Sequence, residues 1–556
     1  MPIQSLYKPI PIPEISFHDL ILNAIWQHSV KEPNKLAMTD TGSGKEWTFG
    51  DLWRNVVAVK SALHKAGLRY QDVVVCALPN SIEYAALSLA VIASGAVVSG
   101  VNPVANAAEL NRQIRDSNAR FVAVSTETAE NSVEAVKSLP SGQIKGFIYM
   151  GDGPSIDNSG LTVHHYDDLA STRPDFNLPP VSLNFKEDLC MLPYSSGTTG
   201  APKGVMLTHY SQVAMAVCIK HWEEVISADA FAAAGIIPSS ANIVGYLPFH
   251  HIYGFMFLFH VMKNGGHTVI MPRFDPVKYL HVLQQYKVKT LNLVPPIAQF
   301  LAKHPLVDQF DLSSCRLAFC GAAPLSEEAE KALLQRLPNI TFVGQGYGMT
   351  ETGMATHLPG FARGKYGNAG LLAVNAQVKV VDPDSGRELG IGEDGEIWLK
   401  APSLMKGYLN KSEATAATLD NDGWIHTGDI GHCDADTYIY VVDRIKELIK
   451  VKGLQVAPAE LESLLNTHPC IADAAVIGVN HPKTGEAPRA FVVLKADKQL
   501  DERDVQKFVE ERVSPYKRLT GGVTFVAEVP KSPSGKILRR LLRDRVKEEI
   551  KMKEKL

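Results

Sequence analysis

Buried-strand patterns that alternate with amphipathic helical patterns constrain the fold of this chain more than any other feature of its sequence. The run "DVVVCALPN" at 72–80 is β-branched and apolar, and the stretch before it, 51–67, carries apolar residues at helical spacing. Strands separated by helices in this way are typical of parallel βαβ units. The strand pattern recurs at 120–126, 145–151, 242–248, 267–272, 289–296, 316–324 and 340–348. We therefore predict an α/β fold whose large N-terminal domain is built from parallel βαβ layers.

The pattern changes toward the C-terminus. From about residue 375 the strands become shorter and alternate apolar with polar residues, as in "GEIWLK" at 395–400, which predicts a β-rich subdomain over about 375–442. A compact α+β pattern follows, with helices expected near 458–466 and 502–512 and a basic helix from Ile537. We predict a large domain over 1–442 and a small, mobile C-terminal domain over 443–556, with a hinge near Asp443.

Composition excludes several classes of protein. The 556 residues carry a net charge of −3, which gives no electrostatic reason to expect nucleic acid as a partner. The seven Cys include no CxxC pair and predict reduced thiols rather than disulfides or a zinc site. No uninterrupted apolar run suits a transmembrane segment, and prolines interrupt the N-terminus where a signal peptide needs an apolar helix. We expect a cytoplasmic protein; the ending "EKL" keeps a peroxisomal location open, although Glu554 stands where that signal has Ser.

The stretch "YSSGTTGAPKG" at 194–204 has the composition of a phosphate-binding loop without the Walker A pattern. Counted from Gly197, the position of the second Walker A glycine is Pro202, and Lys203 is followed by Gly204 rather than Ser or Thr. Glycines let backbone N–H groups approach phosphate, hydroxyl groups donate to its oxygens, and a lysine adds charge. A second stretch, "GQGYGMTETG" at 344–353, fails the dinucleotide fingerprint because its last glycine position is Met349.

Taken together, the motifs resemble the adenylate-forming superfamily, the acyl-CoA synthetases that include 4-coumarate:CoA ligases and beetle luciferases, and they resemble 4-coumarate:CoA ligases most. They stand in family order over roughly 190–540, and jointly they are far more specific than one motif. They are "YSSGTTGAPKG" (194–204), "LPFHHIYG" (247–254), "GAAPL" (321–325), "GQGYGMTE" (344–351), "GWIHTGD" (423–429), "DRIKELIKVKGLQVAPAELE" (443–462) and "PKSPSGKILRR" (530–540).

The resemblance implies an ATP-dependent acid:CoA ligase. A carboxylate attacks the α-phosphorus of ATP, pyrophosphate leaves, and the thiol of coenzyme A then attacks the acyl-AMP. Positioning and charge stabilisation dominate such phosphoryl chemistry. Thr350 and Glu351 are implied to lie at the α-phosphate, with Glu351 helping to hold Mg²⁺. The other implied ATP or AMP contacts are Ser195, Ser196, Gly197, Thr198, Thr199, Gly200, Lys203, Gln345, Gly346, Tyr347, Asp429, Arg444, Lys450, Gln455 and Lys536.

Several of these residues have particular implied roles. Asp429 would accept hydrogen bonds from the ribose hydroxyls, with Arg444 nearby. Tyr347 would either stack on adenine or belong to the core. Lys536 would come from the small domain and stabilise charge on the α-phosphate. Lys450 and Gln455 are implied for adenylation, and Lys452 and Gly453 for the CoA channel, with a rotation about Asp443 exchanging the two faces.

The acyl site is implied by the same resemblance. His251 would lie beside the acyl carboxylate, while Arg273 would either meet a CoA phosphate or be an ordinary surface arginine. The residues implied around the acyl group are His251, Tyr253, Phe257, Ala322, Gly346 and Met354. Phe257 replaces a small polar residue of the plant enzymes, so the partner for a phenolic hydroxyl is missing.

The acid and the acceptor are less constrained. The acid is either a hydroxycinnamate or another aryl acid, or a medium- to long-chain fatty acid, and the sequence leaves the oligomeric state open. Two alternative functions remain at this stage: a luciferase-like oxygenase that acts on a bound adenylate, and a catalytically silent nucleotide- or acyl-binding homologue. The presence of Lys203, Glu351, Asp429 and Lys536 argues against the silent protein.

Overall fold

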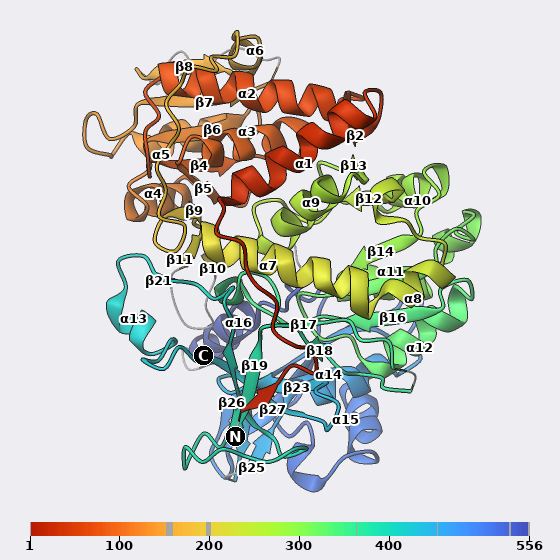
Figure 1. Cartoon of the computed structure of the whole chain (residues 1–556). Coiled ribbons are helices and arrows are strands. Elements are labelled where there is room, and N and C mark those ends of the chain that lie inside the picture. Colours follow the sequence, from red (N-terminus) through yellow and green to blue (C-terminus); the bar gives the residue numbers. More distant parts are fainter. Residues whose placement is uncertain are drawn as a thin grey trace.

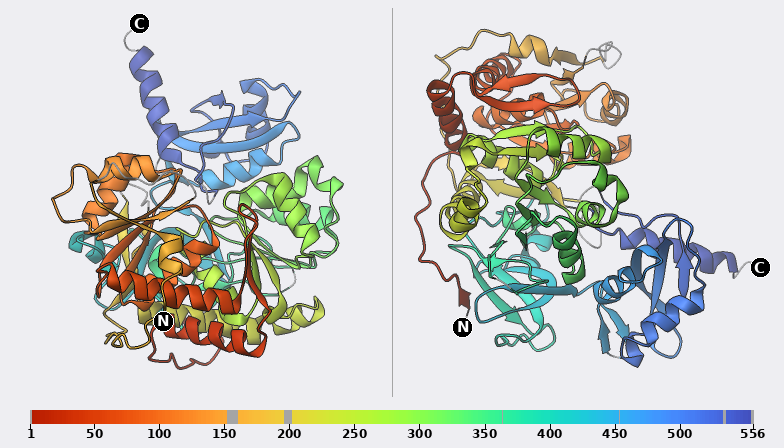
Figure 2. Two further views of the ribbon diagram at one scale, coloured as in Figure 1. Left: turned by 90° about the horizontal axis from the view of Figure 1, so that it is seen from above. Right: turned by 90° about the vertical axis from the view of Figure 1, so that its right-hand side faces the viewer.

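The computed structural model describes residues 2–151, 160–195, 202–362, 364–452, 454–532 and 535–553. A large body that ends with strand β23 (Ile439–Arg444) carries a smaller C-terminal unit at one side of it (Figures 1 and 2). The predicted α/β class and the predicted parallel layers are confirmed.

The first sheet of the large body has nine strands and contains the predicted strands at 72–80, 120–126 and 145–151. Its parallel part follows the order β9-β5-β4-β6-β7-β8, and β10, β11 and β21 extend it with antiparallel pairs. The strands are β4 (Val73–Ala77), β5 (Val97–Gly100), β6 (Phe121–Ser125), β7 (Gly146–Met150), β8 (Thr162–His165), β9 (Leu189–Met191), β10 (Tyr194–Ser195), β11 (Lys203–Thr208) and β21 (Gly407–Tyr408). The accompanying helices are α2 (Phe49–Lys65), α3 (Ile82–Ala93), α4 (Ala107–Asp116), α5 (Ala129–Val136) and α6 (Tyr166–Ala170).

Two further sheets complete the α/β part. One has the order β12-β13-β2-β3, and the other is the parallel set β14-β15-β16, whose carboxyl ends lead into the "GAAPL" and "GQGYGMTE" segments. Their strands are β2 (Leu36–Asp40), β3 (Glu46–Thr48), β12 (Asn242–Gly245), β13 (His267–Ile270), β14 (Thr290–Leu293), β15 (Leu317–Cys320) and β16 (Phe342–Gln345). Their helices are α1 (Phe17–Lys31), α7 (His209–His221), α8 (Ala228–Ala233), α9 (Ile252–Asn264), α10 (Pro276–Gln285), α11 (Pro295–Lys303) and α12 (Glu327–Arg336). Ligands of open α/β sheets bind at the carboxyl ends of the parallel strands, so we expect the site at this edge.

The predicted β-rich part is an antiparallel sheet of five strands in the order β1-β19-β20-β22-β23. Its first strand comes from the extreme N-terminus, where Ile3 pairs with Val378, and the sequence pattern did not predict that strand. The strands are β1 (Ile3–Gln4), β19 (Gln377–Val381), β20 (Gly395–Lys400), β22 (Ile425–Cys433) and β23 (Ile439–Arg444), with the short pair β17 (His357–Leu358) and β18 (Leu371–Leu372) and helix α13 (Ser412–Ala416) beside them.

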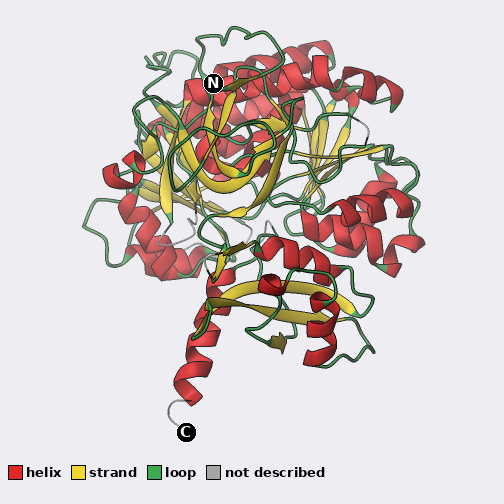
Figure 3. Cartoon of the chain, turned by 90° about the horizontal axis from the view of Figure 1, so that it is seen from below, coloured by secondary structure: helices red, strands yellow, loops and turns green. Residues whose placement is uncertain are grey.

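The C-terminal unit has its own sheet, β25-β24-β27-β26 with β28 beside β27, and its own apolar core. Figure 3 shows this unit below the large body, with α16 leading away from it toward the C-terminus. Its elements are β24 (Ile449–Val451), β25 (Leu454–Val456), α14 (Pro458–Asn466), β26 (Ile471–His481), β27 (Gly485–Leu494), α15 (Glu502–Glu510), β28 (Val523–Phe525) and α16 (Arg539–Lys553). The predicted helices at 458–466 and 502–512 are confirmed, and the basic helix begins at Arg539, two residues after the predicted start.

Strand β11 begins at Lys203, inside the "YSSGTTGAPKG" stretch, and α7 follows it from His209. Strand β11 pairs with β10, β9 and β21, so its backbone is satisfied as a strand within the first sheet. The paired strands hold Ser195 directly opposite Lys203.

The cysteines and the lengths of the helices can be compared with what the sequence predicted. All seven cysteines lie in the described part of the chain and are free thiols; six of them are buried. Within the ranges given above, no helix has the length and apolar character needed to cross a lipid bilayer.

A buried ion pair joins α16 to α14 in the C-terminal unit. Arg539 Nη2 lies 2.9 Å and 2.7 Å from the two carboxylate oxygens of Glu462, and both side chains are nearly enclosed. Burial raises the pKa of Glu462 to about 6, against the lowering effect of Arg539, so this carboxylate depends on its partner to remain charged. Removing one member of such a pair leaves an uncompensated buried charge.

We predict that Arg539→Ala destabilises the C-terminal sheet by about 3 kcal/mol because Glu462 loses its counter-charge. Hydrogen exchange of the β26 and β27 amides should accelerate accordingly, while amides of β4 and β6 in the large body keep their protection. Lys547→Ala, which removes an exposed pair with Asp544, is the matched control and should leave both regions unchanged. Equal behaviour of the two variants would contradict a stabilising role for the buried pair.

Candidate active site

Glu351 lies at the centre of the described polar groups beyond β16. It belongs to a short 3-10 helix, Thr350–Thr352, and is 5% exposed. Ser195 Oγ donates to Glu351 Oε1 at 2.9 Å, and Tyr408 Oη donates to the same oxygen at 2.8 Å. Three segments that are far apart in the sequence therefore meet on one carboxylate oxygen.

Lys203 brings a positive charge to the same place. It is the first residue of β11, and its ammonium group lies 3.9 Å from the centre of the Tyr408 ring. Burial lowers the pKa of Lys203, the charge of Glu351 raises it, and Lys446 lowers it again. Lys203, Glu351 and Lys446 are thus close enough to act on one another's charge. Of the predicted phosphate-loop contacts, Ser196, Gly197, Thr198, Thr199 and Gly200 lie outside the described residues.

A second polar cluster is formed by Asp429, Arg444 and Tyr347. Asp429 and Arg444 face each other on β22 and β23, and Arg444 Nε lies 3.0 Å from Asp429 Oδ1. Tyr347 Oη donates to the other carboxylate oxygen of Asp429 at 2.7 Å. Tyr347 is partly buried and packs against the apolar core of the β-rich sheet while its hydroxyl is held by Asp429.

Lys536 is brought to these clusters from the C-terminal unit. Its pKa is lowered to about 8: burial is the largest cause and Arg444 adds to the lowering, while Asp429, Glu447 and Glu351 oppose it. The neighbouring Gly535 lies against Pro296 at the start of α11, where a Cβ on Gly535 would come within 2.5 Å of the proline ring. Gly535 therefore lies against the large body, and the charges of Asp429 and Glu351 act on the adjacent Lys536.

Helix α9 supplies the groups predicted around the acyl carboxylate. His251 caps its N-terminus, and His251 Nδ1 accepts the backbone N–H of Tyr253 at 3.4 Å. Burial, together with the charge of Lys536, lowers the pKa of His251 to about 4, so this imidazole is neutral near pH 7. Because Nδ1 accepts, the ring proton belongs on Nε2, which can donate a hydrogen bond to an anion.

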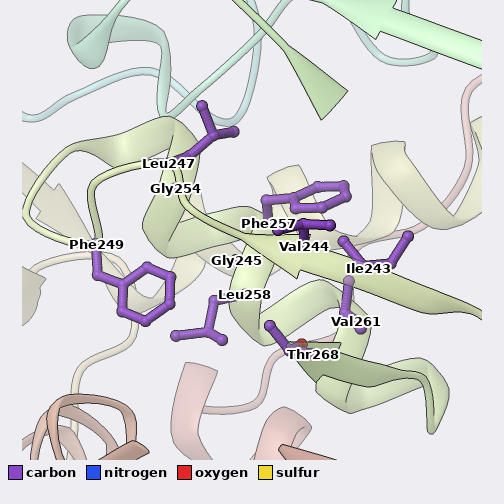
Figure 4. A pocket seen from close by; sticks show the side chains of 10 residues that line it. All are labelled: Ile243, Val244, Gly245, Leu247, Phe249, Gly254, Phe257, Leu258, Val261 and Thr268. Atoms are coloured by element: carbon purple, nitrogen blue, oxygen red, sulfur yellow. The ribbon is translucent and has the colours of Figure 1, made fainter. Parts of the chain in front are cut away.

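The side chains of Tyr253 and Phe257 lie one turn apart on α9, with ring centres separated by 6.4 Å. Tyr253 approaches the "GAAPL" segment so closely that a Cβ on Gly321 would lie 3.3 Å from its ring. Ala322, the next residue, has a left-handed backbone with φ +72°. Phe257 is only partly buried although its helical neighbours are buried, and its ring borders a small apolar cavity between α9 and β12 (Figure 4).

The remaining predicted residues of the "GQGYGMTE" segment lie behind these groups. Gln345 is 4% exposed; its amide donates to the carbonyl of Leu325 at 2.8 Å and accepts the N–H of Leu325 at 2.7 Å. The Gln345 side chain therefore holds the "GAAPL" segment in place from behind. Gly346 follows at the strand end, and Met354 packs between the main core and the aromatic cluster around Trp222.

The predicted residues nearer the surface are not drawn into these clusters. Lys450 and Gln455 face each other across the β24–β25 hairpin with exposed side chains. Lys452 is exposed at the hairpin turn, and Gly453 lies outside the described residues. Arg273 is 66% exposed and forms an ion pair with Glu127. Their predicted roles in adenylation and CoA binding remain predictions.

Family models match both parts of the chain. The AMP-binding enzyme family matches residues 25–409, and the AMP-binding enzyme C-terminal domain matches residues 460–536. The chain belongs to the AMP-binding enzyme family. The resemblance recognised in the motifs is thereby confirmed.

Members of this family resemble the chain over nearly its whole length. A 4-coumarate–CoA ligase from Pinus taeda is 38% identical over 98% of each chain. Peroxisomal OPC-8:0-CoA ligase 1 from Arabidopsis thaliana is 36% identical over 96% of this chain and 94% of its own. The crystal structure of an anthranilate CoA ligase in complex with anthranoyl-AMP has a TM-score of 0.84 and 25% identity, and the match covers 97% of this chain and 99% of that one.

The family of the chain sets its chemistry. It is an adenylate-forming acid:CoA ligase that uses ATP, and solved structures with bound ATP or acyl-AMP are among its structural neighbours. Nothing in these likenesses supports a luciferase-like oxygenase or a catalytically silent homologue.

The sequence analysis assigned no role to two groups of this site, Tyr408 and Lys446. Tyr408 stands in "KGYLN", which carries no recognisable chemistry, and only its pairing with β11 brings it to Glu351.

The pKa of Lys536 generates a prediction for this ligase. An ammonium group serves a phosphate anion only while it is protonated, and the pKa of Lys536 before ATP binds is about 8. We therefore predict that kcat/KM for ATP in the adenylation half-reaction falls above pH 8, approaching about tenfold per pH unit. Pyrophosphate exchange measured from pH 6 to pH 10 checks this.

Lys536→Arg is the matched variant for that experiment, because a guanidinium group stays charged throughout the range. Its activity can be lower, but its profile should stay flat where the unsubstituted enzyme declines. The same alkaline decline in both proteins would show that another group titrates.

Proposed function

We propose that the two polar clusters form one ATP site that activates a carboxylic acid as its acyl-adenylate. Ser195, Lys203 and the loop between them would bind the departing phosphates, and Asp429 would accept hydrogen bonds from the ribose hydroxyls. This proposal is supported by the paired position of Ser195 and Lys203 and by the enclosed carboxylate of Asp429. Tyr347 donates to Asp429 and is only partly buried, and we propose that it stacks on adenine.

Glu351 is the group we propose for Mg²⁺. A carboxylate combined with phosphate oxygens is the usual environment of this ion. The residues fit: both described hydrogen bonds to Glu351 end on Oε1, so the second oxygen, Oε2, is the one we assign to the cation. Bound Mg²⁺ would neutralise phosphate charge, while Ser195 and Tyr408 hold the carboxylate in one orientation.

Lys536 and His251 are proposed to act from opposite sides of the reacting atoms. The ammonium group of Lys536 would stabilise negative charge that develops on the α-phosphate, as preorganised cations do in phosphoryl transfer. The neutral His251 would donate from Nε2 to the acyl carboxylate and orient it for attack on phosphorus. The lowering of the His251 pKa by Lys536 supports the view that the two groups face one space.

Thioester formation requires a different arrangement, because Lys536 and its segment occupy the site during adenylation. We propose that the C-terminal unit rotates about Asp443, so that Lys452 and Gly453 approach the acyl-AMP and line a CoA channel, with Arg273 available to a CoA phosphate. Asp443 suits a pivot: its carboxylate accepts the N–H of Arg444 at 2.7 Å on one side and of Ala459, at the start of α14, at 2.9 Å on the other.

We predict that Asp443→Pro separates the half-reactions, because proline restricts the backbone torsion on which the rotation depends. Adenylation, measured by pyrophosphate exchange, should persist within about tenfold, while thioester formation from supplied acyl-AMP should be lost. Lys536→Ala is the reciprocal variant and should lose adenylation but keep thioester formation. Loss of both half-reactions in both folded variants would contradict an exchange of faces.

For the acid, we propose an apolar aryl carboxylate without a ring hydroxyl. The observation that carries this proposal is Phe257: a partly buried aromatic ring lies one turn beyond Tyr253, where a polar side chain would be needed to bond a phenolic hydroxyl. The anthranilate and 4-coumarate ligases similar to this chain are named for aryl acids. Flat rings stack favourably against Tyr and Phe side chains.

A medium-chain fatty acid is the second candidate, because the side chains around Phe257 are apolar. The cavity beside this residue is lined by apolar residues of β12 and α9, including Val244 and Val261, and Phe257 forms part of its wall (Figure 4). An acyl chain longer than an aryl acid could enter this space only if the Phe257 ring moved aside. Phe257 would then set the length of the acid.

We predict that Phe257→Ala raises kcat/KM for octanoate and decanoate relative to cinnamate by at least about tenfold, because it removes one wall and enlarges the apolar surface. Pyrophosphate exchange with cinnamate, 4-coumarate, octanoate and decanoate, followed by thioester detection, measures this ratio. Phe257→Leu, which keeps apolar bulk, is the control. An unchanged ratio would show that Phe257 does not border the acyl chain.

The cellular location of the enzyme is also a proposal. We infer a cytoplasmic enzyme, with the peroxisome as the alternative because a relative with this architecture is named as a peroxisomal ligase. Imaging of the full chain carrying an N-terminal fluorescent tag distinguishes the two.

A further inference from the structure

The segment 403–409 connects the two ATP-binding segments of the chain through its backbone. On one side, Met405 N–H donates to the carbonyl of Glu351 at 2.8 Å, and Ser403 Oγ donates to the carbonyl of Thr352 at 2.9 Å. On the other side, β21 pairs with β11: Lys406 N–H donates to Met206 at 2.9 Å, and Leu409 N–H donates to Gly204 at 2.8 Å. We call residues 403–409 the bridging segment.

Tyr408 is the residue of the bridging segment that reaches the site with its side chain. Its hydroxyl donates to Glu351 Oε1, and the face of its ring lies 3.9 Å from the Lys203 ammonium group. Its backbone is fixed as well, because Tyr408 N–H donates to Thr415 Oγ1 at 2.9 Å and the residue is 5% exposed. A single rigid side chain thus touches both the acid and the cation of the site.

The two contacts have different physical character. The hydroxyl contact is a charge-assisted hydrogen bond, which fixes the direction of the carboxylate and leaves Oε2 for a cation. Burial and the adjacent Glu351 raise the pKa of Tyr408 far above its usual range, so the hydroxyl keeps its proton and donates. The ring contact is a cation–π interaction, which attracts an ammonium group without neutralising it. Lys203 is therefore held near Glu351 while its full charge remains available to phosphate.

We propose that Tyr408 is a positioning residue that holds Glu351 for Mg²⁺ and Lys203 for the ATP phosphates, one through its hydroxyl and the other through its ring. This inference rests on the proposed ATP site and adds a residue to it. It assigns to one side chain the coupling between the carboxylate of Glu351, in a 3-10 helix, and the ammonium group of Lys203, in β11.

Two substitutions separate the two contacts. Tyr408→Phe removes the hydroxyl and keeps the ring, so the concentration of Mg²⁺ required for half-maximal pyrophosphate exchange should rise roughly tenfold, with little change in the binding of ATP alone. Tyr408→Leu removes both, so the dissociation constant of ATP measured by calorimetry in EDTA should also rise several-fold. A purely structural role would lower activity without this division between Mg²⁺ and ATP.

A double-mutant cycle and a control variant outside the proposed site complete the experiment. In the Lys203→Met background, Tyr408→Leu should no longer weaken the binding of ATP in EDTA beyond what Tyr408→Phe does. Tyr438→Leu serves as the control, because it removes a similar contact with Lys365, 4.5 Å from the Tyr438 ring, outside the proposed site. It should leave both the Mg²⁺ requirement and the ATP dissociation constant unchanged.

The outcomes for this inference and for the ATP site are distinguishable. If the unsubstituted protein binds ATP and Tyr408→Phe keeps the original Mg²⁺ requirement, the positioning role is overturned while the ATP site stands. If the unsubstituted protein binds no ATP, the proposed ATP site itself fails. If both Tyr408 variants bind and exchange as predicted while Tyr438→Leu behaves like the unsubstituted protein, the inference is supported.

Discussion

The contact of Lys536 with the large body is the interaction on which the chemistry of this structure depends. Burying an ammonium group is costly unless carboxylates compensate for it. Here Asp429, Glu351 and Glu447 raise the pKa of Lys536 against burial and against the repulsion from Arg444. The balance leaves the lysine charged at neutral pH but easily perturbed. ATP would add negative charge to the same space, so nucleotide binding and docking of the C-terminal unit should favour each other.

In the proposed rotation the same unit also leaves the site, and its attachment suits that movement. Asp443 ends the last sheet of the large body, while its carboxylate reaches the first turn of α14, so one side chain belongs to both parts. Within the C-terminal unit, Glu462 binds Arg539 and Glu447 forms an ion pair with Arg543, which ties α16 to the elements nearest the pivot. Rigid ion pairs inside the unit, combined with a few hydrogen bonds at its edge, suit rotation as one body.

The sequence was enough to predict the architecture and the reaction, but not which side chains contact one another in the site. Strands such as β4 and β6 are buried on both faces, so their apolar runs were visible without any tertiary information. The two-residue strand β1 has no such pattern and exists only because β19 offers it an edge. Gln345 was assigned to the nucleotide from its motif, yet its amide is engaged by Leu325, a contact that depends on how β15 and β16 lie side by side. Tyr408 was missed for the same reason: its role depends on strand pairing over about two hundred residues of sequence.

The two halves of the site differ in how many segments build them. The proposed ATP half collects polar groups from the ends of several strands, from the 3-10 helix at Thr350–Thr352 and from the C-terminal unit. Ser195 and Tyr408 hold Glu351, and Tyr347 and Arg444 hold Asp429. The proposed acyl half depends largely on α9, where Tyr253 and Phe257 lie a single turn apart and are both partly buried. A change at Phe257 alters the space for the acid without disturbing the hydrogen bonds of the ATP half. This arrangement explains why the sequence identifies the reaction far more sharply than it identifies the acid.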